Sequence, residues 1–326
     1  MFVLTLTCVF HSVLHPLFVD LFANRFRLVS NNNNMLVHFI SVGQADAAAI
    51  NLPDGKVVLI DTGSELVNTT YVNYIKENVL NTKRKDYIDY LILSHADMDH
   101  IGGTMKLLKN FKIGTVYMPK IASNSQGYTE INNFIESNNV YVTQGEECVI
   151  KKSNYSITFF EILNDTNTND SSQVVKVESC GKSFLFTGDI SCSVEELYIE
   201  QYGNKLNADV LKVSHHGSNS STSGEFLKVV TPEYSVVSVG FGNIYGHPTY
   251  DVLQRLNDAD SKILRTDKHG DVLFVVGENY DLFQLHGSYY ITELSLEYVN
   301  LVMVFDGLLL ILSISIILKK EKSKHL

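Results

Sequence analysis

The chain has 326 residues, of which 45% are hydrophobic and 19% are charged, and its net charge is −10 at pH 7. This length suits one large domain or two small ones, and the composition excludes global disorder. The acidic balance argues against a protein that depends on non-specific binding to DNA, although it leaves a local basic groove open. The cysteines include no CxxC pair and are typical of buried small hydrophobic residues rather than of a disulfide framework or a zinc knot.

Residues 1–34 form an apolar N-terminal segment that ends in a run of asparagines. Polar residues and a proline interrupt it at His11, His15, Pro16 and Asp20, and it lacks the basic start and the cleavage site of a signal peptide. It fits a poor membrane helix, an interfacial helix or an uncleaved anchor. Alternatively, translation starts at Met35, where the pattern of a soluble domain begins at once.

Residues 35–288 alternate short apolar runs with turns and helical patterns, which predicts a single domain. Its first half predicts a hairpin about Pro53-Asp54-Gly55, helices over 66–80 and 101–109, and strands over 35–42, 46–52, 56–61, 90–94 and 114–119. Its second half predicts helices over 193–202, 224–230 and 250–257, and strands over 155–163, 172–179, 182–189, 208–214, 234–240, 262–266, 271–276 and 280–285. Early and late clusters of strands with helices between them indicate two sheets with helices outside.

Residues 298–326 are predicted to form a transmembrane helix and a basic tail. The run LVMVFDGLLLILSISIIL, residues 301–318, has a single charge at Asp306, and at about 1.5 Å per residue it roughly spans the hydrocarbon core of a bilayer. The alternative is a buried core helix. The lysines of the tail KKEKSKHL favour a cytoplasmic tail, which makes the chain a single-pass membrane protein with its domain outside the cytoplasm. Arg25 and Arg27 favour the opposite orientation if the first segment inserts.

The stretch SHADMDHIGG, residues 94–103, places four side chains of the types that bind metals in a loop between a strand and a helix. His95 and Asp97 are two residues apart, so in an extended loop their side chains leave on the same side. Asp99 and His100 follow and can face a second ion. The alternative, that these residues cap the following helix, explains one of the four at most. The stretch therefore predicts a metal site.

Three later segments place further ligand types at the ends of apolar strands. In FLFTGDI an apolar strand ends at Asp189, either a carboxylate that bridges two ions or a turn residue, and GNIYGHP places His247 in a glycine-flanked loop, where a histidine is most often only solvated. In LKVSHHGS the next strand ends at His215 and His216, which should point in opposite directions, so that one of them is a ligand. Active sites of open sheets collect at the carboxyl ends of strands, so these segments are expected to meet.

These motifs resemble the metallo-β-lactamase superfamily, and more closely the soluble hydrolase domain attached to the ComEC-type DNA-uptake channel of bacterial competence. The matching segments are VHFISVGQADAAAINLPDGKVVLIDTG, LILSHADMDHIGG, NDSSQVVKV, FLFTGDI, LKVSHHGSNSSTSGEFL and GNIYGHP, in the family's order. The resemblance implies an α/β (α+β) fold, a four-layer αβ/βα sandwich with a two-metal site at one edge. It implies that the metal ligands are His95, Asp97, Asp99, His100, Asp189 and His215, with Asp61 supporting the loop of His95.

The chain departs from the family's pattern at three places. Asp97 stands where many superfamily members have histidine, and Gly43-Gln44-Ala45-Asp46 replaces the usual Gly-Gln-Gly-Asp. The family's separate mid-chain histidine is missing, and the NDSS run at 169–172 stands in its place. One site therefore has more oxygen and less nitrogen than in zinc lactamases, which shifts preference toward Mn²⁺ or Mg²⁺ while Zn²⁺ stays open. A channel of the ComEC type needs many membrane helices, and this sequence predicts one or two, so the channel itself is not expected in it.

The expected function is that of a membrane-tethered metal-dependent hydrolase that cleaves phosphodiesters, with DNA as the substrate and two divalent ions, Zn or Mn, as cofactors. Asp99, His216 and His247 are the catalytic candidates, with one of the histidines protonating the leaving group, and Ser218 would bind a phosphate oxygen. A second hypothesis is a small-molecule hydrolase acting on a lactone, thioester or cyclic nucleotide. A third is a non-catalytic membrane-anchored binding module.

Overall fold

The structure is a computed structural model that describes residues 34–80, 86–119, 121, 123–138, 140–144, 147–277 and 282–286. The predicted helix over 301–318 and all but the last residue of the predicted N-terminal segment lie outside these residues. Across the ranges that are described, the structure contains no helix that is both long enough and apolar enough to cross a membrane.

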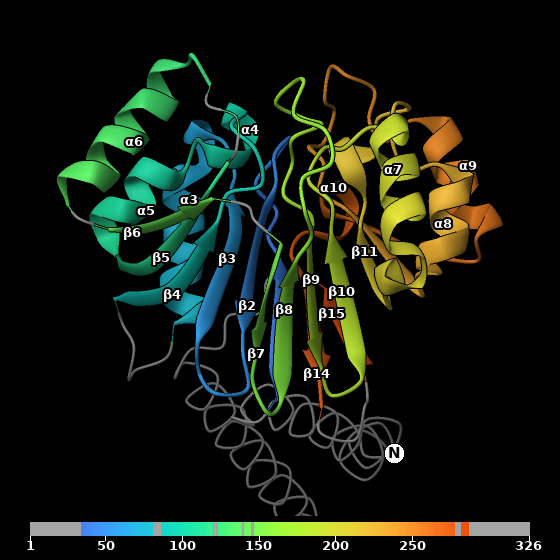
Figure 1. Cartoon of the computed structure of the whole chain (residues 1–326), viewed down its shortest axis with the longest axis horizontal. Coiled ribbons are helices and arrows are strands. Elements are labelled where there is room, and N and C mark those ends of the chain that lie inside the picture. The colour runs from blue at the N-terminus through green and yellow to red at the C-terminus, as the bar shows by residue number, and fades with distance from the viewer. Residues whose placement is uncertain are drawn as a thin grey trace, which may run out of the picture. The chain divides into compact units, whose positions relative to one another are not determined.

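The first sheet has eight strands and takes its last two from the end of the domain (Figure 1). Its order is β15 (Leu282–His286), β14 (Val272–Val276), β1 (Met35–Phe39), β2 (Ala47–Asn51), β3 (Val57–Thr62), β4 (Tyr87–Ile92), β5 (Lys112–Met118) and β6 (Tyr141–Gln144). The pairs from β15 to β3 are antiparallel, and the pairs from β3 to β6 are parallel.

The second sheet has seven strands and the same mixture of directions. Its order is β13 (Lys262–Arg265), β12 (Tyr234–Val237), β11 (Val210–Lys212), β10 (Lys182–Phe186), β9 (Val175–Ser179), β8 (Tyr155–Phe159) and β7 (Cys148–Lys151). The pairs from β13 to β10 are parallel, and the pairs from β10 to β7 are antiparallel.

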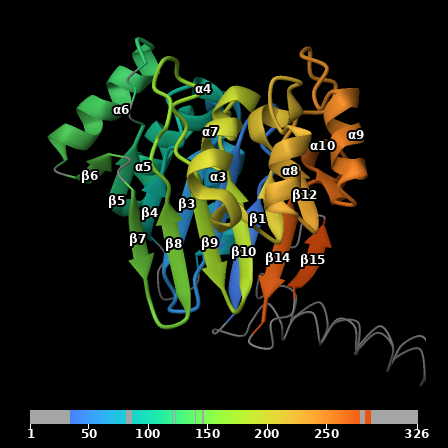
Figure 2. The same cartoon turned by 45° about the vertical axis from the view of Figure 1, so that its right-hand side comes forward.

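Helices cover the outer face of each sheet (Figures 1 and 2). The first sheet packs against α3 (Asn68–Tyr74), its π-helical continuation (Ile75–Val79), α5 (Thr104–Asn110) and α6 (Gln126–Ser137). The second packs against α7 (Cys192–Tyr202), α8 (Gly224–Val230) and α9 (Tyr250–Asp258). The short helices are α4 (Met98–Ile101), α10 (Thr266–His269) and the 3₁₀ turns Glu65–Val67, Gly203–Leu206 and Ser214–Gly217.

The inner faces of the two sheets form one apolar core between them. The Phe39 ring stacks on Phe186 with centroids 5.6 Å apart, and Tyr117 stacks on Phe159 at 4.3 Å, so that each pair joins one sheet to the other. Burying these large rings on both faces is the main favourable contribution to holding two sheets together. The order helix, sheet, sheet, helix confirms the αβ/βα sandwich that the sequence predicts.

The predicted hairpin at 53–55 joins β2 to β3. Leu52 donates its backbone N–H to the Lys56 carbonyl at 2.8 Å and accepts from Gly55 at 2.8 Å. Gly55 has a φ of +81°, in the left-handed region that glycine enters without steric cost. The alternation of this pair buries one face toward the second sheet and the other toward α3, which explains why residues 47–50 and 57–60 are apolar on both faces.

The predicted helix over 101–109 is wrong in its continuity, because two helices, α4 and α5, take its place with Gly102 and Gly103 between them. A side chain on Gly103 would collide with the carbonyl oxygen of Thr62 at the end of β3, and one on Gly102 would collide with the Met98 carbonyl. The two glycines therefore let the chain after the metal-type loop lie directly against the end of β3.

Four elements were not predicted from the sequence: α6, β6, β7 and α10. Helix α6 begins at the cap residue Ser125, whose hydroxyl accepts from the Tyr128 N–H at 3.2 Å, and buries Ile131 and Ile135. Asparagine, serine and glutamate fill half of its other positions, so its apolar stripe is narrow. The strands β6 and β7 lie at the outer edges of the two sheets, where exposure on both faces weakens the alternation of apolar and polar residues.

Candidate metal centre

The side chains of the candidate centre come from the carboxyl ends of strands in both sheets. Figure 1 shows α4 and the connecting loops gathered at this edge, above both sheets. The first sheet supplies Asp61 at the end of β3, His95 and Asp97 in the loop after β4, and Asp99 and His100 in α4. The second sheet supplies Asp189 after β10, His215 and His216 after β11, and His247 in the loop between β12 and α9. The distances between their side chains confirm that these segments meet.

Asp189 lies at the middle of the cluster and is 3% exposed. Its Oδ2 atom is 3.9 Å from Nε2 of His95 and 3.8 Å from Nε2 of His215. Its Oδ1 atom is 3.3 Å from Nε2 of His100. The two oxygens of one carboxylate thus face different histidines, which is the arrangement that a carboxylate bridging two ions requires.

Asp61 and Ser94 fix the first-sheet side of the cluster. Asp61 accepts from the Ser94 N–H at 2.8 Å and from the Ser94 hydroxyl at 2.7 Å, and its Oδ2 lies 2.7 Å from Nδ1 of His100. With Nδ1 held in this way, Nε2 of His100 is the nitrogen that faces Asp189. Asp61 therefore supports the loop of His95, as the resemblance implies, and also orients His100, which the sequence did not predict.

Ser172 holds His95 and Asp189 together. Its hydroxyl is 3.2 Å from Nδ1 of His95 and accepts from the Asp189 N–H at 3.0 Å. Gly188 has a φ of +53°, and a side chain there would come within 2.6 Å of Ser172. The NDSS run thus places a serine close to the metal-type side chains, where the family's missing histidine was expected.

His216 is held from two sides, by Asp99, which was predicted as a site residue, and by Asp46 and the Ser238 carbonyl, which were not. Its Nδ1 lies 2.9 Å from the Ser238 carbonyl oxygen and 3.1 Å from Oδ1 of Asp46, and its Nε2 lies 3.2 Å from Oδ2 of Asp99. Asp46 forms a buried ion pair with Lys212, with 2.6 Å between Oδ2 and Nζ. Asp46, His100 and His216 lie close enough to hold an ion themselves, but Lys212 already neutralises Asp46, which fits a support of His216 better than a ligand.

His215 and His216 reach different carboxylates because the backbone leaves the extended region after β11. His215 has φ and ψ of 49° and 45°, His216 has 52° and 19°, and Gly217 has a φ of +83°. In the extended strand end that the sequence predicted, the side chains of His215 and His216 would point apart. In this left-handed turn, His215 faces Asp189 and His216 faces Asp99, so both lie at the same cluster.

The donor atoms fit metal ions on two grounds. Nε2 of His95, Nε2 of His100 and Oδ1 of Asp189 are buried and have no hydrogen-bond partner among the described residues. A tetrahedral ion with ligands at 2.0–2.2 Å places neighbouring ligand atoms about 3.3–3.6 Å apart. The separations of 3.3–3.9 Å about Asp189, and of 3.8 Å between Nε2 of His95 and Oδ2 of Asp97, are close to that spacing.

The pKa values of the three buried histidines of the cluster shift in different directions. Burial lowers the pKa of His100, but Asp189 and Asp61 outweigh it and hold that pKa well above its usual value. Burial likewise lowers the pKa of His216, and Asp46 with its neighbours raises it to about 10. Burial lowers the pKa of His95 to about 3, with the charge of His100 acting in the same direction. Nearby carboxylates thus favour the protonated form of His100 and of His216, whereas burial favours the neutral form of His95.

Asp97 and Asp99 mark the open side of the cluster. Their side chains are 40% and 39% exposed, whereas His95, His100 and Asp189 are buried. Solvent and substrate can therefore reach the centre past these two carboxylates. Asp97 is the N-cap residue of α4 and Asp99 lies in its first turn, so the exposed rim is built from the same short segment as His95 and His100.

His247 and Ser218 lie at the rim. The half-buried His247 ring is 5.9 Å from the ring of His215, and its Nδ1 has no hydrogen-bond partner within the described ranges. Burial lowers the pKa of His247, and the neighbouring His215 acts in the same direction. The Ser218 hydroxyl is 3.0 Å from that of Ser220, and the Ser218 N–H donates to the carbonyl of His215 at 2.8 Å.

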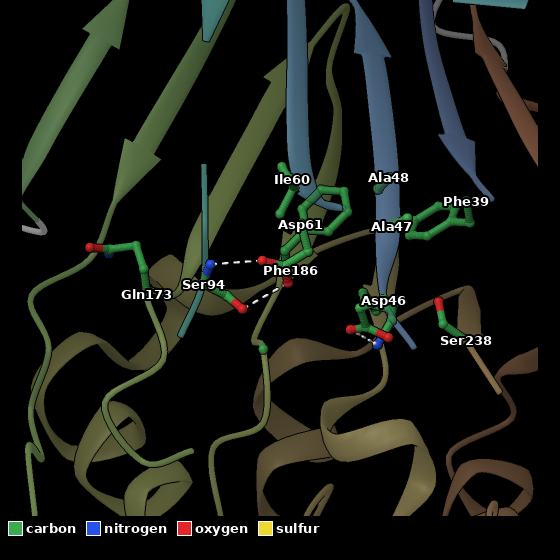
Figure 3. Close-up of a pocket in the computed structure, with 12 residues that line it drawn as sticks. Phe39, Asp46, Ala47, Ala48, Ile60, Asp61, Ser94, Gln173, Phe186 and Ser238 are labelled. Carbon is green, nitrogen blue, oxygen red and sulfur yellow. Dashed lines mark hydrogen bonds and ion pairs between the residues drawn. The ribbon is translucent and has the colours of Figure 1, made fainter. Parts of the chain in front are cut away.

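A small cavity lies between the sheets behind these histidines (Figure 3). Figure 3 shows Ser94 bonded to Asp61 on one side, Asp46 on another, and the Phe39 ring at its apolar end. Two of these residues orient the histidines: Asp61 contacts His100, and Asp46 contacts His216. The cavity thus belongs to the supporting layer of the centre and lies away from the exposed rim.

Asp46, Ser94, Ser172 and Lys212 are the site residues that were not predicted as such. Asp46 and Ser172 stood in segments noted for departing from the family's pattern, so a polar residue there was the available signal. Lys212 is a single lysine in an apolar strand, and it is 4% exposed. A buried lysine needs a buried carboxylate, and the sequence does not say which one.

Comparison with known proteins shows which proteins this chain is similar to. A profile of the metallo-β-lactamase superfamily matches residues 40–240. The chain is 32% identical over 272 residues to ComE operon protein 3 of Bacillus subtilis, covering 78% of this chain and 34% of that protein. It is 33% identical over 225 residues to competence protein ComA of Neisseria gonorrhoeae, covering 68% and 29%. It is 29% identical over 246 residues to recombination protein 2 of Haemophilus influenzae, covering 72% and 28%. The chain thus spans about a third of the length of these relatives.

Proposed function

We propose, from the premise that this chain belongs to the metallo-β-lactamase superfamily, that its metal centre hydrolyses phosphodiester bonds and that its substrate is DNA. A metal-dependent hydrolase of this superfamily needs ligands that hold divalent ions beside an accessible face. The observation that carries the proposal is one buried carboxylate, Asp189, whose Oδ2 atom faces His95 and His215 and whose Oδ1 atom faces His100. The names of two relatives, a competence protein and a recombination protein, support DNA as the substrate.

Two donor sets would hold the ions, one on each side of Asp189. The set about Oδ2 comprises His95, Asp97 and His215, and the set about Oδ1 comprises His100, Asp99 and His216. Assignment of His216 to the second set goes beyond the ligands that the resemblance implies. Each set mixes imidazole nitrogen with carboxylate oxygen, a combination that suits Zn²⁺ and Mn²⁺.

Two ions bound in these sets supply Lewis-acid polarisation of a phosphoryl oxygen and lower the pKa of water. The chain's own residues keep that arrangement in place. Asp61 fixes the ring of His100, and Asp46 with the Ser238 carbonyl fixes the ring of His216. Because these supports are buried, the donor atoms need little reorganisation when substrate arrives.

His247 is the better of the two candidates for moving a proton to the leaving group. Both ring nitrogens of His216 already face other groups, Nδ1 the Ser238 carbonyl and Nε2 the carboxylate of Asp99. His247 is half-buried at the rim and keeps Nδ1 without a partner among the described residues. Ser218, also at the rim, would donate its hydroxyl to a phosphate oxygen.

The test uses the full chain, loaded with Mn²⁺ or Zn²⁺ and assayed on single-stranded DNA, duplex DNA, bis-p-nitrophenyl phosphate and a lactone. We expect cleavage of the phosphodiesters, with two ions per chain by elemental analysis. Asp189→Ala should lose both ions and the activity, whereas Asp271→Ala, at a carboxylate that accepts from the Ser41 N–H away from the cluster, should keep both. Turnover of the lactone without the phosphodiesters would favour the small-molecule hydrolase instead, and one ion or none would contradict the two-metal centre.

A further inference from the structure

The loop that carries His247 exposes a group of large apolar side chains. Phe241 is 90% exposed, Ile244 92% and Tyr245 65%, and Tyr250 at the start of α9 is 76% exposed. Single exposed apolar residues are ordinary, but four within ten residues form a patch that calls for a function. In this segment only His247 was predicted from the sequence as a site residue. We call Phe241, Ile244, Tyr245 and Tyr250 the aromatic patch.

The loop beneath the aromatic patch is held by hydrogen bonds. Asn243 accepts from the His247 N–H at 3.0 Å, and its amide donates to the His247 carbonyl at 2.7 Å and to the Gly240 carbonyl at 3.1 Å. The Gly240 N–H donates to the Gln44 side chain at 3.1 Å. The exposed rings therefore project from a closed turn that is fixed to the end of the first sheet.

The aromatic patch is continuous with the candidate metal centre. The Tyr245 ring stacks on His247, with centroids 5.8 Å apart and planes inclined by 27°. The His247 ring is in turn 5.9 Å from His215, whose Nε2 lies 3.8 Å from Asp189. A row of flat rings thus leads from the exposed loop to the residues that would hold the ions.

We propose that the aromatic patch stacks the unpaired bases of a single DNA strand whose phosphodiester lies at the metal centre. This inference rests on the proposed function and narrows its substrate from DNA to single-stranded DNA. Exposed aromatic rings bind bases of any sequence through their faces, and each contact contributes about 1–3 kcal/mol. In a duplex those faces are covered by neighbouring bases, so the patch selects unpaired strands.

Charge supports stacking as the principal contact away from the metal centre. The chain carries a net charge of −10, so a long track of lysines and arginines along the DNA backbone is not expected to supply the affinity. Stacking depends little on salt, whereas each phosphate contact to a single strand adds about 0.7 to the logarithmic salt slope. Binding should therefore weaken less than about tenfold between 50 and 200 mM salt, as one or two phosphate contacts would give.

The test measures the anisotropy of a fluorescein-labelled oligothymidine with the full chain in a chelator, so that binding is read without cleavage. Three strands are compared: the oligothymidine, the same strand with abasic sites, and the duplex. We expect Phe241→Ala and Tyr245→Ala each to weaken binding of the oligothymidine about tenfold. Neither should weaken binding of the abasic strand further, because the bases that the rings contact are then missing. Tyr141→Ala, at a ring 67% exposed on the edge strand β6, is the matched control and should bind like the wild type.

Cleavage of bis-p-nitrophenyl phosphate separates failure of this inference from failure of the proposed function. No hydrolysis by the metal-loaded wild type would contradict the proposed function. Hydrolysis of that compound together with equal binding of abasic and normal strands would overturn the stacking surface alone. Binding of vesicles that is lost in Phe241→Ala, with no base-dependent binding of DNA, would make the patch a membrane contact and would also overturn it.

Discussion

At the scale of single residues, Asp61 joins the loop of His95 to the ring of His100. Its backbone φ of 58° lies in the left-handed region at the end of β3, which turns the carboxylate toward Ser94 and His100. Aspartate is among the few non-glycine residues that tolerate this conformation. One residue therefore sets both the path of the chain and the tautomer of a ligand.

Asp61→Asn tests that positioning role. We expect about 10- to 100-fold weaker metal binding, because an amide can no longer serve as acceptor for both Ser94 and His100. Titration with the metal ion, followed calorimetrically, gives the dissociation constant. Asp209→Asn is the control, since Asp209 also accepts from a serine N–H and hydroxyl, those of Ser183, away from the centre. Equal metal affinity in the two variants would remove Asp61 from the metal centre.

His38 gives a prediction about pH that does not involve the metal centre. The ring lies buried on β1, with Nδ1 3.0 Å from the Tyr74 hydroxyl and Nε2 3.2 Å from Oδ1 of Asn51. Burial lowers its pKa from 6.5 to about 4. Below pH 6.5 His38 binds a proton in the unfolded chain but stays neutral in the folded chain. The contribution of His38 to the free energy of unfolding is therefore complete above pH 6.5 and is lost as the pH falls toward 4.

The expected loss is about 3 kcal/mol in the free energy of unfolding across that interval. Urea unfolding of the wild type and of His38→Gln, measured at several pH values, isolates the contribution as the difference between the two curves. Other histidines titrate in both proteins and cancel. Parallel curves between pH 7 and 4 would show that His38 is protonated in the folded state.

At the scale of elements, the sequence predicted strands that are apolar on both faces and helices that have a wide apolar stripe. Helix α8 has the predicted bounds Gly224–Val230, and β1 to β3 follow the predicted hairpin. The edge strands β6 and β7 escaped because burial, which produces the pattern, is weak there. For the site, the ligand types could be read from the sequence, but the partners Asp46 and Lys212 depend on contacts between distant segments.

The start of α8 also depends on a distant partner. Glu195 in α7 is buried and accepts from the backbone N–H groups of Thr222 and Ser223, the residues just before α8. Its carboxylate satisfies two donors at the end of the loop that begins with His215 and His216. Glu195 thus fixes the far end of that loop, from inside the second sheet's helical layer.

Glu195→Ala should lower the free energy of unfolding by about 1–3 kcal/mol, because it leaves buried N–H groups without acceptors. Chemical denaturation measures the change. The matched control is Glu225→Ala in the first turn of α8, whose carboxylate pairs with Lys228 in solvent and should change stability by less than about 0.5 kcal/mol. Similar losses in the two variants would contradict the capping role of Glu195.

At the scale of the whole molecule, each sheet contains an antiparallel part and a parallel part, and the parallel strands of both deliver their carboxyl ends to the metal centre. The last strands, β14 and β15, return to the first sheet and pair with β1. The last strands of the domain therefore pair with its first strand, and both halves of the domain are needed to complete the first sheet.

This closure supports the prediction that residues 35–288 fold alone. All strands and helices of the sandwich lie within that range. We expect a shortened chain with those ends to be soluble, to melt cooperatively and to bind two divalent ions. Calorimetry and elemental analysis measure both properties. A requirement for residues 1–34 would contradict the domain boundary predicted at Met35.

The location of the domain remains a proposal drawn from the sequence. We propose that residues 301–318 span a membrane with the basic tail inside, since Lys319, Lys320, Lys322 and Lys324 each contribute about 1 kcal/mol on an anionic cytoplasmic leaflet. The domain would then lie outside the cytoplasm. Protease added to intact cells should remove it and leave the tail protected. Protection of the domain in intact cells, with digestion after lysis, would place it in the cytoplasm.

The position of Asp189 between donors from both sheets has a mechanical consequence. His95, Asp97, Asp99 and His100 belong to the first sheet's loops, while Asp189, His215 and His216 belong to the second's. Ions held there would act as a reversible cross-link between two layers that are otherwise joined by apolar contact and by a few polar contacts such as the Asp46–Lys212 ion pair. The free energy of metal binding would then add to the stability of the sandwich, and removal of the ions would weaken the contact between the two sheets at the edge that carries the candidate centre.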